Sequence, residues 1–191
     1  MDKASGVDKV SCSVERKKGF TENAKAQGVF TVTCHDKDGN LKWTAQAPNL
    51  VVNTGLQYMA ESALGGGSQI TTWYLGLYGA GASNDPAAGD TMASHSGWTE
   101  VEDYSELVRQ TAVFDTATTA APSVITNSAS AAQFNMDASV TVGGAFLTSD
   151  DTKGGTSGTL FSAADFQSPG DRAVVSGDVL NVTYTFSLAA T

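Results

Sequence analysis

The clearest pattern of apolar and polar residues lies in the C-terminal stretch Gly177–Leu188, GDVLNVTYTFSL. Its large apolar residues recur at every second position, while most residues between them are polar. A period of two is typical of a β-strand that has one buried and one solvated face. The stretch therefore predicts a strand whose buried face consists of Leu180, Val182, Tyr184, Phe186 and Leu188. Such a strand needs partners earlier in the chain.

A second unit with the same period spans Gly28–Ala45. Two alternating runs flank the polar segment His35–Asn40, which contains Asp38-Gly39. Alternating runs around an Asp-Gly pair predict a β-hairpin. The acidic turn also resembles the first half of a calcium loop, but the position of the required Glu falls in the second run. We therefore favour a turn, with a solvated His35 at its shoulder.

A change of period marks the only helix that we expect. Apolar residues at helical spacing from Leu56 to Leu64 follow Asn53 and Thr54, which can cap a helix start, and precede Gly65, which can end it. We expect this helix to cover one open end of a pair of sheets. The next segment, Ile70–Tyr78, is apolar on both faces, which predicts a central strand or one covered by a partner subunit.

Short alternating runs and turns fill the rest of the chain. Gly76 permits close packing against a strand, Gly143-Gly144 predicts a bulge or bend, and Phe166 is expected to fill a core edge. The segment 98–114 can be read as helical or extended. These patterns predict an all-β protein: an antiparallel β-sandwich or jelly-roll-like domain over residues 28–191, with one short helix and an extended N-terminal arm over residues 1–27.

Charge separates this arm from the body. The chain has 191 residues and a formal net charge of −9. Residues 1–42 hold 8 of the 11 Lys/Arg and 6 of the 20 Asp/Glu. An acidic body argues against nucleic-acid binding, which needs a basic surface. Two isolated cysteines, Cys12 and Cys34, favour reduced thiols over a disulfide framework, although a bridge between them stays open. We find no signal peptide and no membrane-spanning run, so no membrane partner is expected.

Candidate chemistry is sparse. The acidic residues between Glu100 and Glu106 could supply a pair of catalytic carboxylates, but a solvated edge with Arg109 tied to one of them is the favoured interpretation. With two histidines and none of the common catalytic or phosphate-binding motifs, we expect no enzyme, no cofactor and no metal site. Exposed aromatic residues can stack on sugars, and Trp73, Tyr74, Tyr78 and Trp98 are candidates for this, although core positions are favoured for them.

Six blocks of the sequence resemble a family of tailed-bacteriophage virion proteins. They are Asn49–Leu56 (NLVVNTGL), Thr71–Leu77 (TTWYLGL), Asp90–Trp98 (DTMASHSGW), Gly143–Leu147 (GGAFL), Lys153–Leu160 (KGGTSGTL) and Gly177–Phe186 (GDVLNVTYTF). The blocks follow one another over most of residues 49–188, whereas the arm lies outside the resemblance. The order of the blocks carries the resemblance, because no single block is specific.

The resemblance implies a structural protein of the phage particle without cofactor or catalytic residues. We expect a capsid decoration (cement) protein, made in the host cytoplasm and seated on the capsid surface. Its partners would be the major capsid protein and copies of itself in a homo-oligomer such as a trimer. The alternative is a tail, baseplate or fibre component that binds a host receptor or glycan. Candidate subunit-contact residues are Phe20, Trp73, Tyr74, Tyr78 and Trp98.

Overall fold

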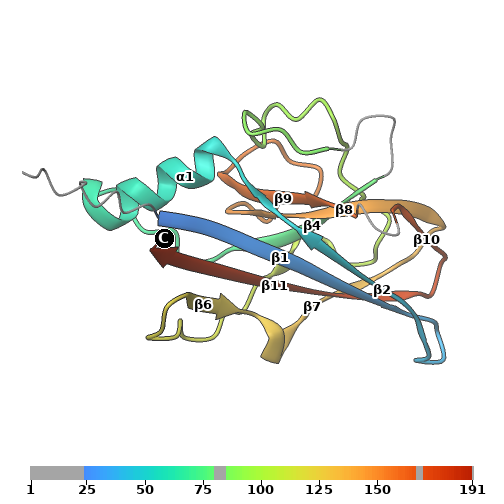
Figure 1. Cartoon of the computed structure of the whole chain (residues 1–191). Coiled ribbons are helices and arrows are strands. Elements are labelled where there is room, and N and C mark those ends of the chain that lie inside the picture. The colour runs from blue at the N-terminus through green and yellow to red at the C-terminus, as the bar shows by residue number, and fades with distance from the viewer. Residues whose placement is uncertain (1–23, 80–84, 167–169, 191) are drawn as a thin grey trace, which may run out of the picture.

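The predicted C-terminal strand is present as β11 (Val179–Ala190) in a computed structural model that describes residues 24–79, 85–166 and 170–190. It lies in the middle of one of two antiparallel sheets packed as a sandwich (Figure 1). The predicted β-sandwich is therefore confirmed. Its buried face is shorter than predicted, because Leu180, Val182 and Tyr184 are buried whereas Phe186 and Leu188 are not.

Sheet A is formed by the hairpin and the C-terminal strand, with two short strands beyond. β11 pairs with β1 on one side and with β6 and β7 on the other, while β2 forms the far edge. The bounds are β1 (Ala24–His35), β2 (Leu41–Pro48), β6 (Ser123–Thr126) and β7 (Ala132–Asn135). The strand β1 begins four residues before Gly28, where the predicted hairpin began, because Ala24 already pairs with Ala190.

Sheet B is formed mainly from the second half of the chain, in the order β3-β9-β8-β4-β5, with β10 also paired to β8. The bounds are β3 (Leu50–Val51), β4 (Tyr74–Gly79), β5 (Gln110–Thr111), β8 (Val140–Thr148), β9 (Leu160–Asp165) and β10 (Arg172–Val174). The predicted bulge is confirmed: Tyr78 pairs with Gly144 and Gly79 with Val142, which leaves Gly143 as the extra residue.

The β1–β2 connection is the predicted turn. Gly39 adopts a positive φ of 83°, and its N–H donates to the Asp36 carbonyl. The Asp36 carboxylate accepts hydrogen bonds from the Asn40 side chain and from the backbone N–H groups of Asp38 and Asn40. These bonds, first the one from the Asn40 side chain, lower the pKa of Asp36. The Asp36 carboxylate therefore stabilises the turn through these hydrogen bonds.

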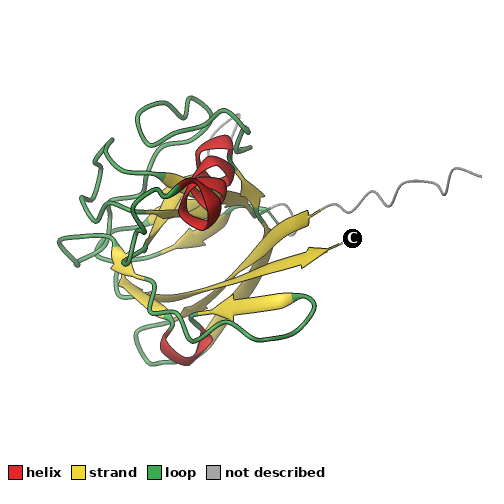
Figure 2. Ribbon diagram, turned by 90° about the vertical axis from the view of Figure 1, so that its left-hand side faces the viewer, coloured by secondary structure: helices red, strands yellow, loops and turns green. Residues whose placement is uncertain are grey.

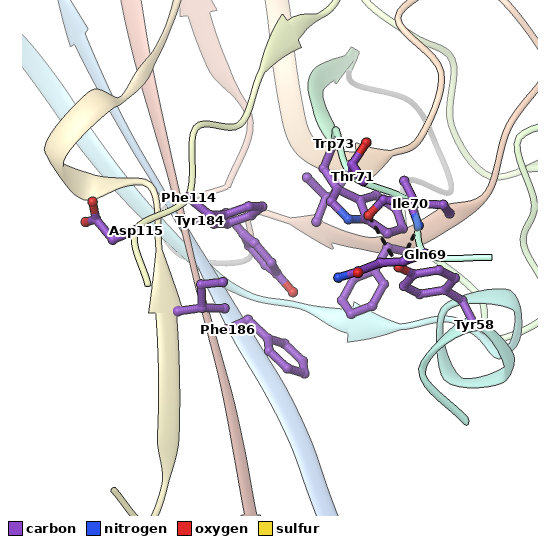
Figure 3. A pocket seen from close by; sticks show the side chains of 12 residues that line it. Tyr58, Gln69, Ile70, Thr71, Trp73, Phe114, Asp115, Tyr184 and Phe186 are labelled. Atoms are coloured by element: carbon purple, nitrogen blue, oxygen red, sulfur yellow. Dashed lines mark hydrogen bonds between the residues drawn. The ribbon is translucent and has the colours of Figure 1, made fainter. Parts of the chain in front are cut away.

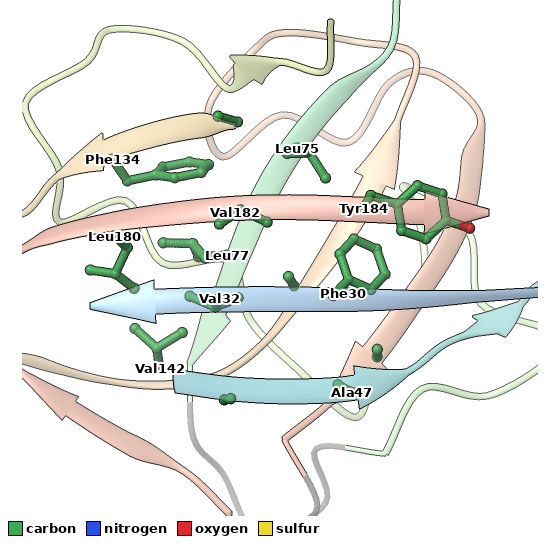
Figure 4. Close-up of a cluster of buried hydrophobic side chains, with 14 of the residues drawn as sticks. Phe30, Val32, Ala47, Leu75, Leu77, Phe134, Val142, Leu180, Val182 and Tyr184 are labelled. Atoms are coloured by element: carbon green, nitrogen blue, oxygen red, sulfur yellow. The ribbon is translucent and has the colours of Figure 1, made fainter. Parts of the chain in front are cut away.

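The main core lies between the two sheets. Figure 4 shows Phe30, Val32, Leu180 and Val182 of sheet A near Leu75 and Leu77 of sheet B. All six of these side chains are fully buried. Alternation in β1 and β11 places these apolar residues on one face, so the spacing of apolar residues along each strand sets which face becomes the core.

A second apolar cluster occupies the outer face of sheet B. We call it the covered cluster; it consists of Val52, Tyr78, Met92, Trp98, Phe146, Leu160 and Ala163. The loop that includes residues 85–109 supplies Met92 and Trp98 and covers this face. The ring of Phe146 lies against Gly76, where a Cβ would meet it at 2.2 Å. The prediction of close packing at Gly76 is confirmed, and sheet B is buried on both faces. The strand predicted over Ile70–Tyr78 is shorter in the structure, because β4 begins only at Tyr74.

The predicted helix is present as α1 (Asn53–Ala60), which continues as a π-helical turn, η1 (Glu61–Gly65). Gly66 ends it in the left-handed conformation, with φ of 72°. Neither Asn53 nor Thr54 caps it, because the Thr54 hydroxyl instead donates to the Leu160 carbonyl. Gly55 is its only buried residue. The helix is attached by its first turn and by Tyr58 and Met59, which pack against the core. Figure 2 shows it at one end of the sandwich.

Candidate functional site: an aromatic pocket at the open end of the sandwich

A pocket of about 400 Å³ opens between the sheets at the end where α1 lies. We call it the aromatic pocket. Its lining residues come from α1, from the segment before β4, from both sheets and from the loop after β5: Tyr58, Gln69, Ile70, Thr71, Trp73, Phe114, Asp115, Ile125, Leu147, Phe161, Tyr184 and Phe186. Figure 3 shows Phe114, Tyr184 and Phe186 on one side, and Trp73, Gln69 and Tyr58 on the other.

Tyr184 forms the inner part of the pocket and is held on several sides. Its hydroxyl accepts a hydrogen bond of 2.7 Å from the Asn49 side chain and lies 3.3 Å from the Ser162 hydroxyl. Asn49 also accepts a 2.6 Å bond from the Gly28 N–H, so one side chain links β1 to β11. A Cβ on Gly28 would lie 2.6 Å from the Tyr184 hydroxyl, which explains why glycine is needed there. Burial raises the pKa of Tyr184 above its usual range.

Aromatic rings line the pocket in edge-to-face contacts. The centroids of Tyr58 and Trp73 are 5.2 Å apart, those of Trp73 and Phe161 are 5.4 Å apart, and those of Phe161 and Phe186 are 5.5 Å apart. Rings in this arrangement support one another by contact between a positive edge and a negative face. The walls are therefore preformed, apolar and suited to a further apolar or aromatic group.

Few polar groups face the pocket. The Tyr58 hydroxyl accepts a 3.0 Å bond from the Ile70 N–H, which holds the segment before β4 against α1. Gln69, Thr71 and the exposed Asp115 are the other polar side chains that line the pocket, and Asp115 is the charged one. The rim thus offers one negative charge beside a largely apolar cavity, which favours an occupant that combines an apolar group with a cation.

Exposed apolar residues extend the surface around the pocket. Leu188 is 39% exposed and lies two residues beyond Phe186 on the same face of β11. Leu56 in α1 and Leu64 in η1 are 46% and 92% exposed. The helix was predicted to cover one open end of the sheet pair, and it does lie at this end. Tyr58 and Met59 pack against the core, whereas Leu56 and Leu64 stay exposed. A pocket joined to exposed leucines is typical of an interaction surface.

The predicted contact residues are divided between different environments. Trp73 lines the aromatic pocket and is partly buried, as is Tyr74. Tyr78 is fully buried and Trp98 is 5% exposed, and both belong to the covered cluster. Their burial removes Tyr78 and Trp98 as contact residues of the folded chain and favours the core interpretation for both. Phe20 lies outside the described residues.

The acidic segment 100–106 is tied into the fold. Glu100 forms a two-pronged ion pair with Arg109 at 2.6 and 2.9 Å, with both side chains buried. Arg109 also donates to the carbonyls of Asp150 and Gly155. The carboxylate of Glu106 binds the Asn135 backbone and side chain. The prediction that Arg109 is tied to one of these acids is confirmed. Both carboxylates have structural partners.

Lys153 strengthens the same junction between two loops. Its ammonium group donates to the carbonyls of Tyr104 and Glu106, each at 2.8 Å, and lies 4.3 Å from the centroid of the Tyr104 ring. Loop 100–109 is thereby joined to loop 149–158 by two cations, Arg109 and Lys153. The cover of sheet B is consequently held by charge-assisted hydrogen bonds, which are the stronger class.

Other candidate chemistry is structural as well. Among the described residues, no group of three or more His, Cys, Asp and Glu side chains is placed to hold a metal ion. The pKa of the buried Cys34 thiol is raised to about 11, first by burial and then by Asp178, so this thiol is poorly reactive. Within the part of the chain that the structure describes, no helix is long and apolar enough to cross a bilayer.

Sequence reasoning identified one pocket residue among its contact candidates, Trp73, and missed most of the others. Phe186 and Leu188 were placed in the core because they continue the alternation of β11. Tyr58 lies in the predicted helix but was not among the apolar residues at helical spacing, and Phe114 lies in the segment that could be read as helical or extended. One sequence signal for the pocket was available, since the apolar alternation of β11 continues past the part of the strand that is buried. The alternation alone does not show which of these apolar residues the other sheet covers.

Comparisons with known proteins give no match for this chain: no family model fits it, and neither the curated proteins nor the solved structures contain a significant relative. The assignment of function therefore depends on the sequence blocks and on the geometry of the open end.

Proposed function

We propose that the protein is a structural component of a tailed-phage particle, which binds the outer surface of the capsid lattice as a decoration protein. Two kinds of support exist. The first is the ordered set of sequence blocks, and the second is the open end of the sandwich, where apolar residues remain exposed. In this role the protein has no catalytic task, and it adds buried area between capsid subunits.

The blocks that resemble virion proteins include the framework around the pocket. Asn49 and Tyr184 belong to the first and last blocks, and they are joined by a hydrogen bond. Trp73 belongs to the second block and lines the pocket. The blocks 90–98 and 153–160 lie in or beside the loops that cover and brace sheet B. The resemblance therefore involves residues that build this particular sandwich and its open end.

The observation that carries the proposal is the aromatic pocket at the end of the sandwich where three leucines are also exposed. Leu56, Leu64 and Leu188 are exposed at the end that holds the aromatic pocket, whereas other exposed apolar residues, such as Leu41, Leu107 and Val175, lie elsewhere on the surface. Burial of such a surface in repeated contacts stabilises a lattice even when each single contact is weak, because many copies act together. A rigid domain with an apolar binding surface at one end suits binding to a capsid lattice.

Capsid binding can be tested with particles assembled without this protein. Purified protein should bind them at symmetry-related sites and raise the temperature at which the capsids dissociate. Imaging of the decorated particle locates the added density. Absence of the protein from purified heads together with its presence in tails would contradict the proposal.

A matched pair of variants tests the role of the open end. Leu64 and Leu107 are 92% and 90% exposed, so either can be changed to Glu with little effect on folding. Leu64→Glu places a charge at the open end and should weaken capsid binding at least about tenfold, since it costs about 1.4 kcal/mol or more of interface energy. Leu107→Glu should bind as the unchanged protein does. Equal binding by both variants would show that another surface contacts the capsid.

A tail, baseplate or fibre role that includes glycan binding is the second candidate. The partly buried Trp73 beside Tyr58 and Gln69 offers an aromatic face with polar neighbours, a combination that suits sugars (Figure 3). A glycan array followed by titration with Trp73→Ala tests this role. Retention at millimolar sugar that disappears in Trp73→Ala supports it, and lack of any binding at that concentration contradicts it.

A further inference from the structure

The aromatic pocket lies where the N-terminal segment leaves the described fold. β1 begins at Ala24, which pairs with Ala190 at the end of β11. Figure 1 places the start of β1, the end of β11 and α1 together at one end of the molecule. Residues 1–23 precede Ala24, and an extended segment of this length reaches at most about 76–83 Å. The segment is thus attached beside the pocket and long enough to reach another molecule.

The composition of this segment complements the pocket. Phe20 is the only aromatic residue in positions 1–23, and three consecutive cations, Arg16, Lys17 and Lys18, precede it. The pocket offers aromatic walls, and Asp115 lies at its outer margin beside Phe114, with its exposed carboxylate directed away from the rings (Figure 3). A phenyl ring that enters the pocket would leave the cations two to four residues away, within reach of this carboxylate.

We propose that the aromatic pocket binds Phe20 from the N-terminal segment of a second copy of this chain. The inference develops the self-association that is part of the proposed function. Each copy then supplies one Phe20 and one pocket. Such a head-to-tail contact forms a closed ring when the rotation between copies closes.

The length of the chain favours a second copy over the same copy. Gly28 pairs with Phe186 and Ala24 with Ala190, so the paired strands run four residues, about 13 Å, past Phe186. The four-residue link from Phe20 to Ala24 spans at most about 13–14 Å. A chain that also has to reverse its direction within this link has no length left to return Phe20 to the level of Phe186.

The first test measures self-association of the full chain by analytical ultracentrifugation over a concentration series. Phe20→Ala removes the ring and should weaken association about ten- to a hundredfold, the range expected for exposure of one buried phenyl group. Val10→Ala is the matched control, an apolar residue of the same segment outside the proposed contact, and should associate as the unchanged protein does. Association that is absent in the full chain, or equal in both variants, overturns the proposal.

The second test probes the charge at the rim. Asp115→Lys should weaken association several-fold, and the effect should shrink at high salt because exposed charges are screened. Asp38→Lys makes the same change of charge in the exposed β1–β2 turn and should have little effect. An equal effect of both variants would show that only overall charge matters and would contradict a contact at Asp115.

The third test identifies the occupant and its chain of origin. A photoreactive phenylalanine analogue is placed at position 20 in an equal mixture of isotopically heavy and light full chains. Cross-links between heavy and light chains at Trp73, Ile125 or Phe186 support the proposal. Cross-links within single chains, or at residues outside the pocket, overturn it. All three tests use isolated protein. A negative result in them contradicts self-association through Phe20 but does not contradict capsid binding. Conversely, a protein that does not bind capsids can still self-associate through Phe20.

Discussion

Two groups of aromatic residues in this protein have opposite environments. Tyr78, Trp98 and Phe146 lie on the outer face of sheet B within the covered cluster, and loops exclude water from them. Tyr58, Trp73 and Phe186 line a pocket that stays open. Both groups form ring contacts at similar distances, 5.1 Å between Trp98 and Phe146 and 5.2 Å between Tyr58 and Trp73. Ring packing alone therefore does not decide which group is covered.

The difference lies in the polar contacts that hold the cover in place. The indole N–H of Trp98 donates to the buried carboxylate of Asp90, and Arg109 binds Glu100 and two carbonyls of the neighbouring loop. At the open end, the Tyr58 hydroxyl holds only the backbone of Ile70. Long loops exclude water from an apolar face when buried polar groups fix them there. Without such contacts, the face remains available for a partner.

Removal of the Arg109 guanidinium, which holds the loops that cover sheet B, should have the largest effect on stability. Arg109→Ala leaves the Glu100 carboxylate buried without its partner and should lower the free energy of unfolding by about 3–5 kcal/mol. Urea denaturation measures this loss, and greater quenching of Trp98 fluorescence by acrylamide would report the loosened cover. Lys37→Ala, which breaks an exposed ion pair with Asp38, is the control and should change stability by less than about 1 kcal/mol. Equal effects would contradict the role given to Arg109.

Two leucines on the same face of β11 allow a direct comparison of the main core with the open end of the sandwich. Leu180 is fully buried, whereas Leu188 is 39% exposed. Leu180→Ala should cost about 2.7–5 kcal/mol of stability, and Leu188→Ala less than about 1 kcal/mol, because partner atoms surround only the first. Thermal and urea unfolding of dilute protein measure both. A loss at Leu188 as large as that at Leu180 would mean that the open end is covered within a single chain.

A smaller effect is expected at the inner part of the pocket. Tyr184→Phe removes the hydroxyl that accepts a hydrogen bond from Asn49, and it should lower stability by about 1–2 kcal/mol. Tyr58→Phe, at the partly exposed rim, should lower stability by about 0.5–1 kcal/mol. Urea denaturation distinguishes the two values. A larger loss at Tyr58 would show that the rim, rather than the link through Asn49, holds the pocket together.

The smallest predicted effect depends on pH. Burial, and then the nearby Asp85 and Asp171, raise the pKa of Asp165 above its ordinary value of 3.8. The folded chain therefore holds this proton more tightly than the unfolded chain, so the contribution of Asp165 to stability falls as pH rises from 3.8 through the raised value. Asp165→Asn should remove this fall.

The Asp165→Asn variant should be slightly more stable than the unchanged protein at neutral pH, by less than about 0.5 kcal/mol, because the carboxyl group is only partly buried and solvent screens it. The difference should vanish at pH values below the ordinary carboxyl pKa. Calorimetry at several pH values checks this trend. A variant that is less stable at neutral pH would contradict the sign of the shift.

Local patterns were sufficient to predict much of the fold. The alternation in residues 28–45 and 177–188, the Asp-Gly turn, the short helix and the bulge at Gly143 were all predicted because each depends on neighbours in the chain. The ion pair of Arg109 was also foreseen, since its acids lie close in sequence. The pocket was not foreseen, because its walls come from segments as distant as Tyr58 and Phe186.

By itself, the sequence determined where most of the long strands lie and which of their side chains share a face, because a strand repeats every two residues whatever surrounds it. It did not determine their exact bounds, since β1 begins at Ala24 and β4 only at Tyr74. It also determined the charge difference between the N-terminal segment and the body. Only the tertiary structure decided which apolar residues are covered. Leu180 and Leu188 have the same position in the pattern, but only Leu180 is packed in the core between the sheets, and Leu188 is exposed. Water exclusion depends on that long-range placement, which no local pattern encodes.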